Sequence, residues 1–166
     1  MSRSLIFILP LFFLLACHSD KDKALAYNDS IIQYQIRLVE KMDSINSLIE
    51  KKDTASAHQQ LLSLQNNVRE WIPKLSSVDT IPGGANMKKL MVDLLKYYDG
   101  LLASAYPGIL AVAGNDTTSV EDIKAQLMGL QLLEMGAMQI EKQLREAQDS
   151  LIEKYNIRVS RVEKSE

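Results

Sequence analysis

Cysteine, glycine, proline and surplus basic charge are all scarce in this chain, and each shortage excludes a class of protein. A single cysteine among 166 residues rules out a disulfide framework and a thiolate metal cluster. Seven glycines and four prolines are too few for a collagen-like or low-complexity disordered chain. The formal net charge of −2 supplies none of the basic surplus that nucleic-acid binding requires, so we expect no nucleic-acid partner.

Chemically active groups are scarce as well. The only histidines are His18 and His58, and the sequence contains no Glu-x-x-His pair, zinc-ligand spacing or Cys-x-x-Cys-His haem motif. We therefore expect no catalytic residue, no metal site and no cofactor, and we expect that the protein is not an enzyme. What is present, 46% hydrophobic residues with abundant Leu, Gln, Glu and Lys, predicts a single all-α domain.

The first 16 residues have the proportions of a signal peptide. Arg3 is followed by an apolar segment, 5–15, that is too short to span a bilayer comfortably. The closing sequence Leu-Leu-Ala-Cys at 14–17 resembles the lipobox of bacterial lipoproteins. That resemblance implies cleavage between Ala16 and Cys17 and a diacylglycerol thioether on Cys17. The alternative is an ordinary secretory signal peptide with an incidental cysteine.

The lipobox resemblance has consequences for location. It implies a mature protein that several acyl chains on Cys17 tether to a membrane of the bacterial cell envelope, because one chain alone anchors only marginally. His18 is not Asp, and under the sorting rule for such lipoproteins this favours the outer membrane, with the periplasmic and surface faces both open. The expected organisation is a signal peptide at 1–16, a lipidated N-terminus and polar linker at 17–23, a helical domain at 24–157 and a flexible tail at 158–166.

Four long helices with short connections are expected in the domain. Apolar residues spaced three and four apart predict helices over residues 24–51, 54–75, 86–112 and 118–155. We expect Pro73 to kink or end the second helix and Pro107 to interrupt the third, since proline lacks an amide donor. Thr118 and Glu121 have the spacing of a capping box that opens the fourth helix. Such helices favour an antiparallel, up-down-up-down four-helix bundle.

The middle of the expected fourth helix is apolar almost all round. Leu127 and Leu130 lie on one side, and a second set lies opposite: Met128, Leu132 and Met135. One interpretation is a central helix covered on every side. The other is that Met128, Leu132 and Met135 form a surface for a protein partner or a second copy of the chain, since methionine-rich faces adapt to partners.

Two carboxylates of the same helix, Glu134 and Glu141, lie on the face expected to be buried. A buried carboxylate is costly unless it is paired, so we expect a cation from a facing helix: Arg37, Arg69 or Lys96. The alternative is an enzyme in which Glu134 and Glu141 act as acid and base, in a cleft without a basic partner.

Six triplets of Asp, then Ser or Thr, then an apolar residue or Thr recur along the chain. They resemble the acceptor motif of a general periplasmic O-glycosylation system, which implies six candidate acceptors: Ser30, Ser44, Thr54, Thr80, Thr117 and Ser150. Capping and turn chemistry accounts for the triplets that begin at 53, 79 and 116, but not for those at 43 and 149. Attached sugars require positions outside the core.

Together these features predict a non-enzymatic, lipid-anchored envelope protein that binds a protein partner or acts as a scaffold at the outer membrane. One alternative is a helical lipoprotein that binds a small molecule, in a pocket near Pro73 and Pro107 lined by tyrosine and methionine. The third is the enzyme that uses Glu134 and Glu141.

Overall fold

The structure is a computed structural model that describes residues 19–115, 117–133 and 135–157. Within these residues every regular element is an α-helix and there is no strand, which confirms the all-α fold class. The five helices are α1 (Asp20–Glu50), α2 (Thr54–Ser76), α3 (Ala85–Ala113), α4 (Val120–Leu133) and α5 (Met135–Lys154).

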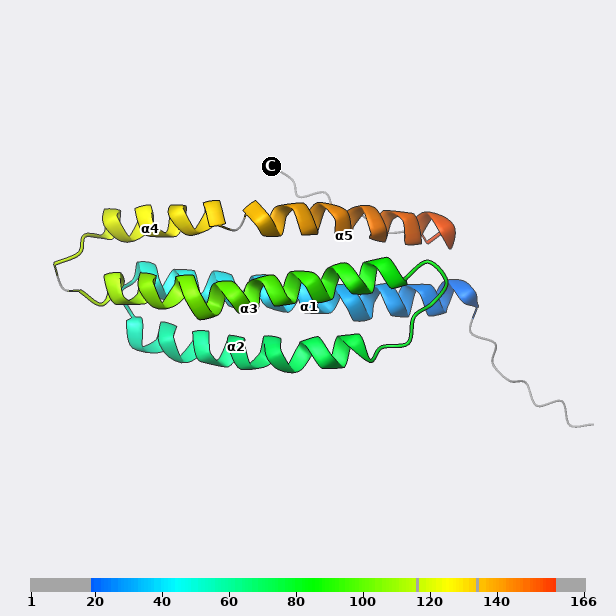
Figure 1. Cartoon of the computed structure of the whole chain (residues 1–166), viewed down its shortest axis with the longest axis horizontal. Helices are drawn as coiled ribbons and strands as arrows, with labels where there is room; N and C mark the ends of the chain where they lie inside the picture. Colours follow the sequence, from blue (N-terminus) through cyan, green and yellow to red (C-terminus); the bar gives the residue numbers. More distant parts are fainter. Residues whose placement is uncertain (1–18, 116, 134, 158–166) are drawn as a thin grey trace, which may run out of the picture.

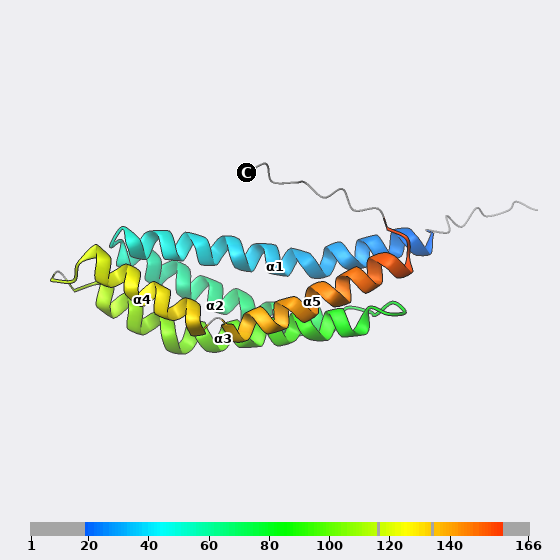
Figure 2. The same cartoon turned by 90° about the horizontal axis from the view of Figure 1, so that it is seen from above.

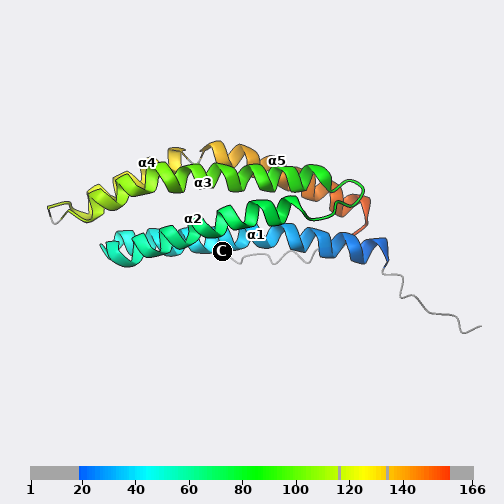
Figure 3. The ribbon, with the colours of Figure 1, turned by 60° about the horizontal axis from the view of Figure 1, so that its bottom comes forward.

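The helices lie side by side along the long axis of the molecule. In Figure 1, α4 and α5 follow one another along one edge, α2 lies along the opposite edge, and α3 runs between them. Figure 2 places α1 on the other side of the molecule from α3, and α5 crosses from α3 toward the start of α1. Figure 3 shows α1 beside α2. The chain reverses direction after α1, after α2 and after α3, and α3 touches each of the other four helices.

The first helix begins earlier than the sequence predicts. Ser19 and Asp22 form a capping box, in which the Asp22 backbone N–H donates to Ser19 Oγ at 3.2 Å and the Ser19 backbone N–H donates to Asp22 Oδ2 at 3.3 Å. This cap starts α1 at Asp20 rather than near Ala24. Four residues of the predicted linker therefore form the first turn of the helix.

The prediction that Pro107 interrupts the third helix is wrong, because α3 continues through it to Ala113. Pro107 and Gly108 are exposed, whereas Tyr106 and Ile109 on either side are buried. Burying two such side chains contributes about 3–6 kcal/mol, which offsets the cost of about 3 kcal/mol for a proline inside a helix. In α2 the helix also continues through Pro73, and it ends three residues later at Ser76.

The predicted fourth helix corresponds to α4 and α5, and its cap differs by one residue from the predicted one. Ser119 and Asp122 form the capping box, with the Asp122 backbone N–H donating to Ser119 Oγ at 3.1 Å. The predicted pair, Thr118 and Glu121, does not cap the helix; the Thr118 carbonyl instead accepts a hydrogen bond from Lys52 Nζ. Both pairs have the required spacing, and the contact with Lys52 keeps Thr118 in the loop.

A tyrosine of α3 reaches the point where α4 ends. The hydroxyl of Tyr97 donates to the carbonyl oxygen of Leu133, the last residue of α4, and the Tyr97 ring lies against Gly136 near the start of α5. A Cβ at Gly136 would lie 2.5 Å from Tyr97 Oη, so only glycine fits there without displacing the ring. Tyr97 therefore holds the end of α4 and the start of α5 against α3.

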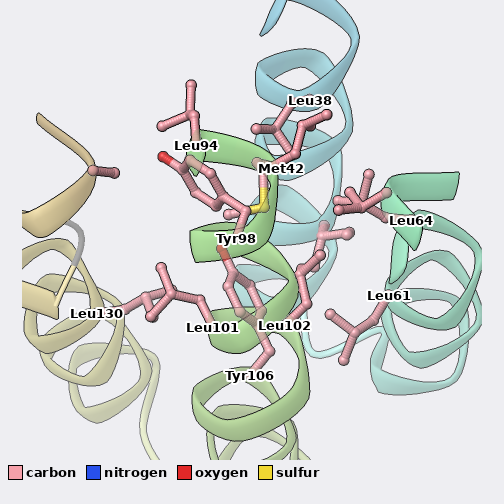
Figure 4. Close-up of a cluster of buried hydrophobic side chains, with 14 of the residues drawn as sticks. Leu38, Met42, Leu61, Leu64, Leu94, Tyr98, Leu101, Leu102, Tyr106 and Leu130 are labelled. Carbon is pink, nitrogen blue, oxygen red and sulfur yellow. The ribbon is translucent and has the colours of Figure 1, made fainter. Parts of the chain in front are cut away.

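The core is built around α3. Figure 4 shows its central cluster, in which Leu102 of α3 points toward Leu61 of α2 and Leu101 of α3 toward Leu130 of α4. Polar ties at the edges of the core join distant segments: Tyr106 Oη donates to Asn46 Oδ1 at 3.2 Å, Gln148 Nε2 to Asn28 Oδ1 at 2.9 Å, and Tyr27 Oη to the Gly84 carbonyl at 2.8 Å. These ties fix α3, α5 and the α2–α3 loop against α1.

Candidate interaction surface

The inner side of α4 and α5 repeats every seven residues. Seven residues make two helical turns, so such positions share one face. This face is buried at every step: Ile123, Leu130, Ala137, Leu144 and Leu151, each at most 3% exposed. It anchors the two helices on α3 and α1.

The outer side follows a second repeat that starts two residues earlier, and all of its members are exposed: Glu121, Met128, Met135, Lys142 and Asp149. Met128 and Met135 are 66% and 60% exposed, and Met138, one turn after Met135, is 63% exposed. We name Met128, Met135 and Met138 the methionine face. Because these side chains are mainly in solvent, the interpretation of a helix covered on every side is wrong for this face.

Two of the three predicted members of the surface are thus placed on one exposed side. The side chain of the third, Leu132, lies outside the described residues. Met138 was not among the predicted members, although its spacing of three from Met135 puts it on the same side of the helix. Met87 and Met91 of α3 are 0% exposed, so methionine is a core residue elsewhere in this molecule. The methionine face is therefore a feature of the outer side of α4 and α5.

Of the two acidic residues expected to form ion pairs, Glu134 lies outside the described residues. Glu141 is half-buried, and burial raises the pKa of its carboxyl group while the charge of Arg145, on the same helix, opposes that rise. Arg69, one of the three expected partners, is bound instead to Asp99 at 2.9 Å between Nε and Oδ1. Among the described residues Glu141 therefore has no ion pair with Arg69, and the expected pair with Glu134 stays a prediction.

A small cavity of about 200 Å³ adjoins Gly108, close to Pro107, where the ligand-binding alternative places a pocket. Its described lining comes from α3 and α4 and is mainly small or aliphatic, with Gly108, Gly129 and Leu130 among its walls rather than tyrosine or methionine. Ligand sites usually occupy 300–1,000 Å³. A larger hollow of about 590 Å³ lies against α5, and its described lining, which includes Met135 and Met138, comes from that helix alone. It is an open surface in the part of the chain that the structure describes.

The candidate O-glycosylation acceptors lie at the surface. Five of the six are exposed and Thr54 is half-buried. In three triplets the third residue is a core residue: Ile31, Ile45 and Leu151. A helix that turns from solvent to core passes through Asp, then Ser, then an aliphatic residue, so helical patterning also accounts for the triplets that begin at 29, 43 and 149. Asp53 accepts a hydrogen bond from the Ser56 backbone N–H at 3.1 Å and caps α2, as capping chemistry predicts.

The predicted cleavage and lipidation residues, Ala16 and Cys17, lie outside the described residues. Among the described helices, none combines the length and apolar character that a bilayer span requires. Across residues 19–115, 117–133 and 135–157, no group of three or more Asp, Glu, His and Cys is arranged to hold a metal ion. In comparisons with known proteins, no family model, curated protein or solved structure matches this chain.

Proposed function

We propose that this chain is a non-enzymatic, lipid-anchored protein of the bacterial cell envelope, which acts as a protein-interaction module at the outer membrane. In this proposal Cys17 carries the lipid, and α1, α2, α3 and the α4–α5 pair are the four antiparallel arms of an up-down-up-down bundle. The alternation of chain direction supports the bundle. The Leu-Leu-Ala-Cys sequence supports the anchor.

The observation that carries the interaction role is the exposure of the methionine face. Monomeric surfaces tolerate single exposed apolar residues, but three large ones within eleven residues of one helical side concentrate unburied apolar area. Met128, Met135 and Met138 are each at least 60% exposed while the opposite side of the same helices is buried. Since α4 and α5 already have a complete inner face, the outer one is free to bind a protein.

A double substitution tests the interaction role. Met128→Asp with Met135→Asp places two charges on the methionine face, and we expect it to remove the protein from its assembly, measured by chemical cross-linking in intact envelopes. Leu62→Asp is the matched control, because Leu62 is 47% exposed on α2, away from this face. Loss of the assembly in the control, or its persistence in a folded double variant, contradicts the proposal.

Metabolic labelling with a clickable fatty acid tests the anchor. We expect the full chain to take up the label and Cys17→Ser to lose it, because the thioether needs the sulfur. A chain from which the leader is removed but which carries no label contradicts the lipoprotein proposal.

The O-glycosylation proposal has a separate test. Thr80 lies exposed in the α2–α3 loop, where backbone is most accessible to a modifying enzyme. We expect peptide mass spectrometry of protein from envelopes to find a sugar mass on Thr80, lost in Thr80→Ala and kept in Thr80→Ser. Unmodified peptides at all six acceptors contradict this proposal.

A further inference from the structure

We infer that the methionine face binds a second copy of this chain, in an antiparallel pairing whose two-fold axis passes between Met128 and Met135. This inference rests on the proposed function, in which the face binds a protein, and it names that protein. Three features of the outer repeat support it: the positions of its methionines, the order of its charges and its length.

The outer repeat is complementary to itself when one copy is reversed. A two-fold axis midway between Met128 and Met135 brings Met128 of one copy against Met135 of the other. The same axis is midway between Glu121 and Lys142, so it also brings Glu121 of one copy beside Lys142 of the other. All four side chains are exposed. The same two-fold axis therefore pairs methionine with methionine and glutamate with lysine.

The charges disfavour the other arrangement. In a parallel pairing, Glu121 would face Glu121 and Lys142 would face Lys142, and like charges in contact destabilise an interface. Antiparallel pairing also places Met138 beside the small exposed Ala125 of the second copy, three residues beyond each central methionine contact. A large side chain opposite a small one packs without a gap.

The length of the repeat sets the strength of the pairing. Between Glu121 and Lys142, the helical residues of α4 and of α5 together rise about 32 Å. A contact of that length along one helical face is smaller than the roughly 800 Å² per partner of a standard interface, so the dimer is weak and reversible in solution. Two copies tethered to one membrane share a raised effective concentration, which favours pairing in the envelope.

Cysteine cross-linking of the full chain, purified from envelopes in detergent, tests the pairing. Met128→Cys and Met135→Cys are prepared separately, mixed and oxidised. In the inferred dimer position 128 lies opposite position 135, so the mixture forms a disulfide-linked dimer. Each variant alone forms none, because its two introduced thiols lie two turns apart, beyond disulfide reach.

A charge exchange tests the register independently. Glu121→Lys and Lys142→Glu each replace attraction by repulsion at both symmetric contacts, and we expect each to weaken self-association about ten-fold. The combined variant restores the opposite-charge pairs and the association. Sedimentation velocity over a concentration series measures the three variants and the unsubstituted chain.

Several results overturn the inference. They are a full chain that stays monomeric, a thiol variant that forms dimers on its own, and a combined charge variant that stays as weak as the single ones. Protection of the introduced thiols by phosphatidylglycerol vesicles, on a monomeric chain, also overturns it and assigns the face to a lipid surface. The unsubstituted chain is oxidised in parallel. If the unsubstituted chain forms a disulfide through Cys17, that result contradicts the proposed anchor. The charge-exchange variants then decide whether the antiparallel dimer forms.

Discussion

The methionines of α3 and those of α4 and α5 have opposite surroundings. Met87 and Met91 are completely buried, because α3 has other helices on several sides, whereas Met128, Met135 and Met138 are more than half exposed on helices that are packed on one side. Residue type therefore does not decide burial in this molecule. Burial depends on whether a side chain faces a neighbouring helix or solvent. Among the described residues, the methionines on the outer side of α4 and α5 pack against no core residue, so the core does not require them to be apolar.

The largest expected effect contrasts one methionine from each region. We expect Met91→Ala to lower the free energy of unfolding by about 2–5 kcal/mol, because it removes a fully buried side chain and leaves a cavity. Met135→Ala is expected to change it by less than about 0.5 kcal/mol. Urea unfolding followed by circular dichroism measures both, and equal losses would show that the two regions do not differ.

A pair of glycines makes the same contrast through added volume. A Cβ at Gly84 would lie 2.5 Å from the Tyr27 ring, which is buried and held by its hydrogen bond to the Gly84 carbonyl. Gly84→Ala is expected to cost about 1–3 kcal/mol through overpacking. Gly129→Ala, where a Cβ meets open space, is expected to gain about 0.5–1 kcal/mol of helix stability. A gain at Gly84 would contradict the close packing of that end of the molecule.

A smaller loss of stability is expected when a contact on the inner side of α5 is removed than when a core methionine is truncated, and the outer side of α5 provides the control. Asn28 is 8% exposed and accepts the hydrogen bond of Gln148, which ties α5 to α1. We expect Asn28→Ala to lower the free energy of unfolding by about 1–2 kcal/mol, because the Gln148 amide loses its partner. Gln139→Ala, exposed on the outer side of α5, serves as the control and is expected to have little effect in the same urea titration.

The smallest expected effect is a pH dependence at Glu141. Burial raises the pKa of this carboxyl above its ordinary value, so the folded state binds the proton more tightly than the unfolded state. The charged form therefore costs stability at neutral pH, and the cost disappears as pH falls through the raised pKa. We expect Glu141→Gln to gain less than about 1 kcal/mol at pH 7 and nothing at pH 4, measured by urea midpoints. A loss at pH 7 would contradict this sign.

Local patterns predicted most of the fold. Apolar spacing located the three helices that precede residue 114, because these helices are amphipathic. It predicted an interruption at Pro107 that does not occur, since the cost of a local proline is visible in the sequence but the burial of Tyr106 and Ile109 that offsets it is tertiary. The contact of Tyr97 with Leu133 and Gly136 joins segments more than thirty residues apart, so no local pattern contains it.

In the candidate site, too, helical spacing predicted which residues are exposed, whereas contacts between helices were not predictable. Periodicity alone put Met128 and Met135 opposite the buried leucines, because side-chain direction along a helix depends only on residue number. The partner of Arg69 was not predictable, since it depends on which residue of α3 lies across from it, and that residue is Asp99. Met138 follows the same helical spacing as Met128 and Met135, and counting one turn beyond Met135 would have included it.

Methionine oxidation by dilute peroxide shows whether the methionine face is covered by a partner in the envelope. The rates at individual methionines are measured by mass spectrometry, in the isolated full chain at low concentration and in intact envelopes. We expect fast sulfoxide formation at Met128, Met135 and Met138 and slow formation at Met87 and Met91 in the isolated chain. In envelopes we expect Met128, Met135 and Met138 to become protected from oxidation. Unchanged fast oxidation of the methionine face in envelopes would contradict the claim that this face is a binding surface.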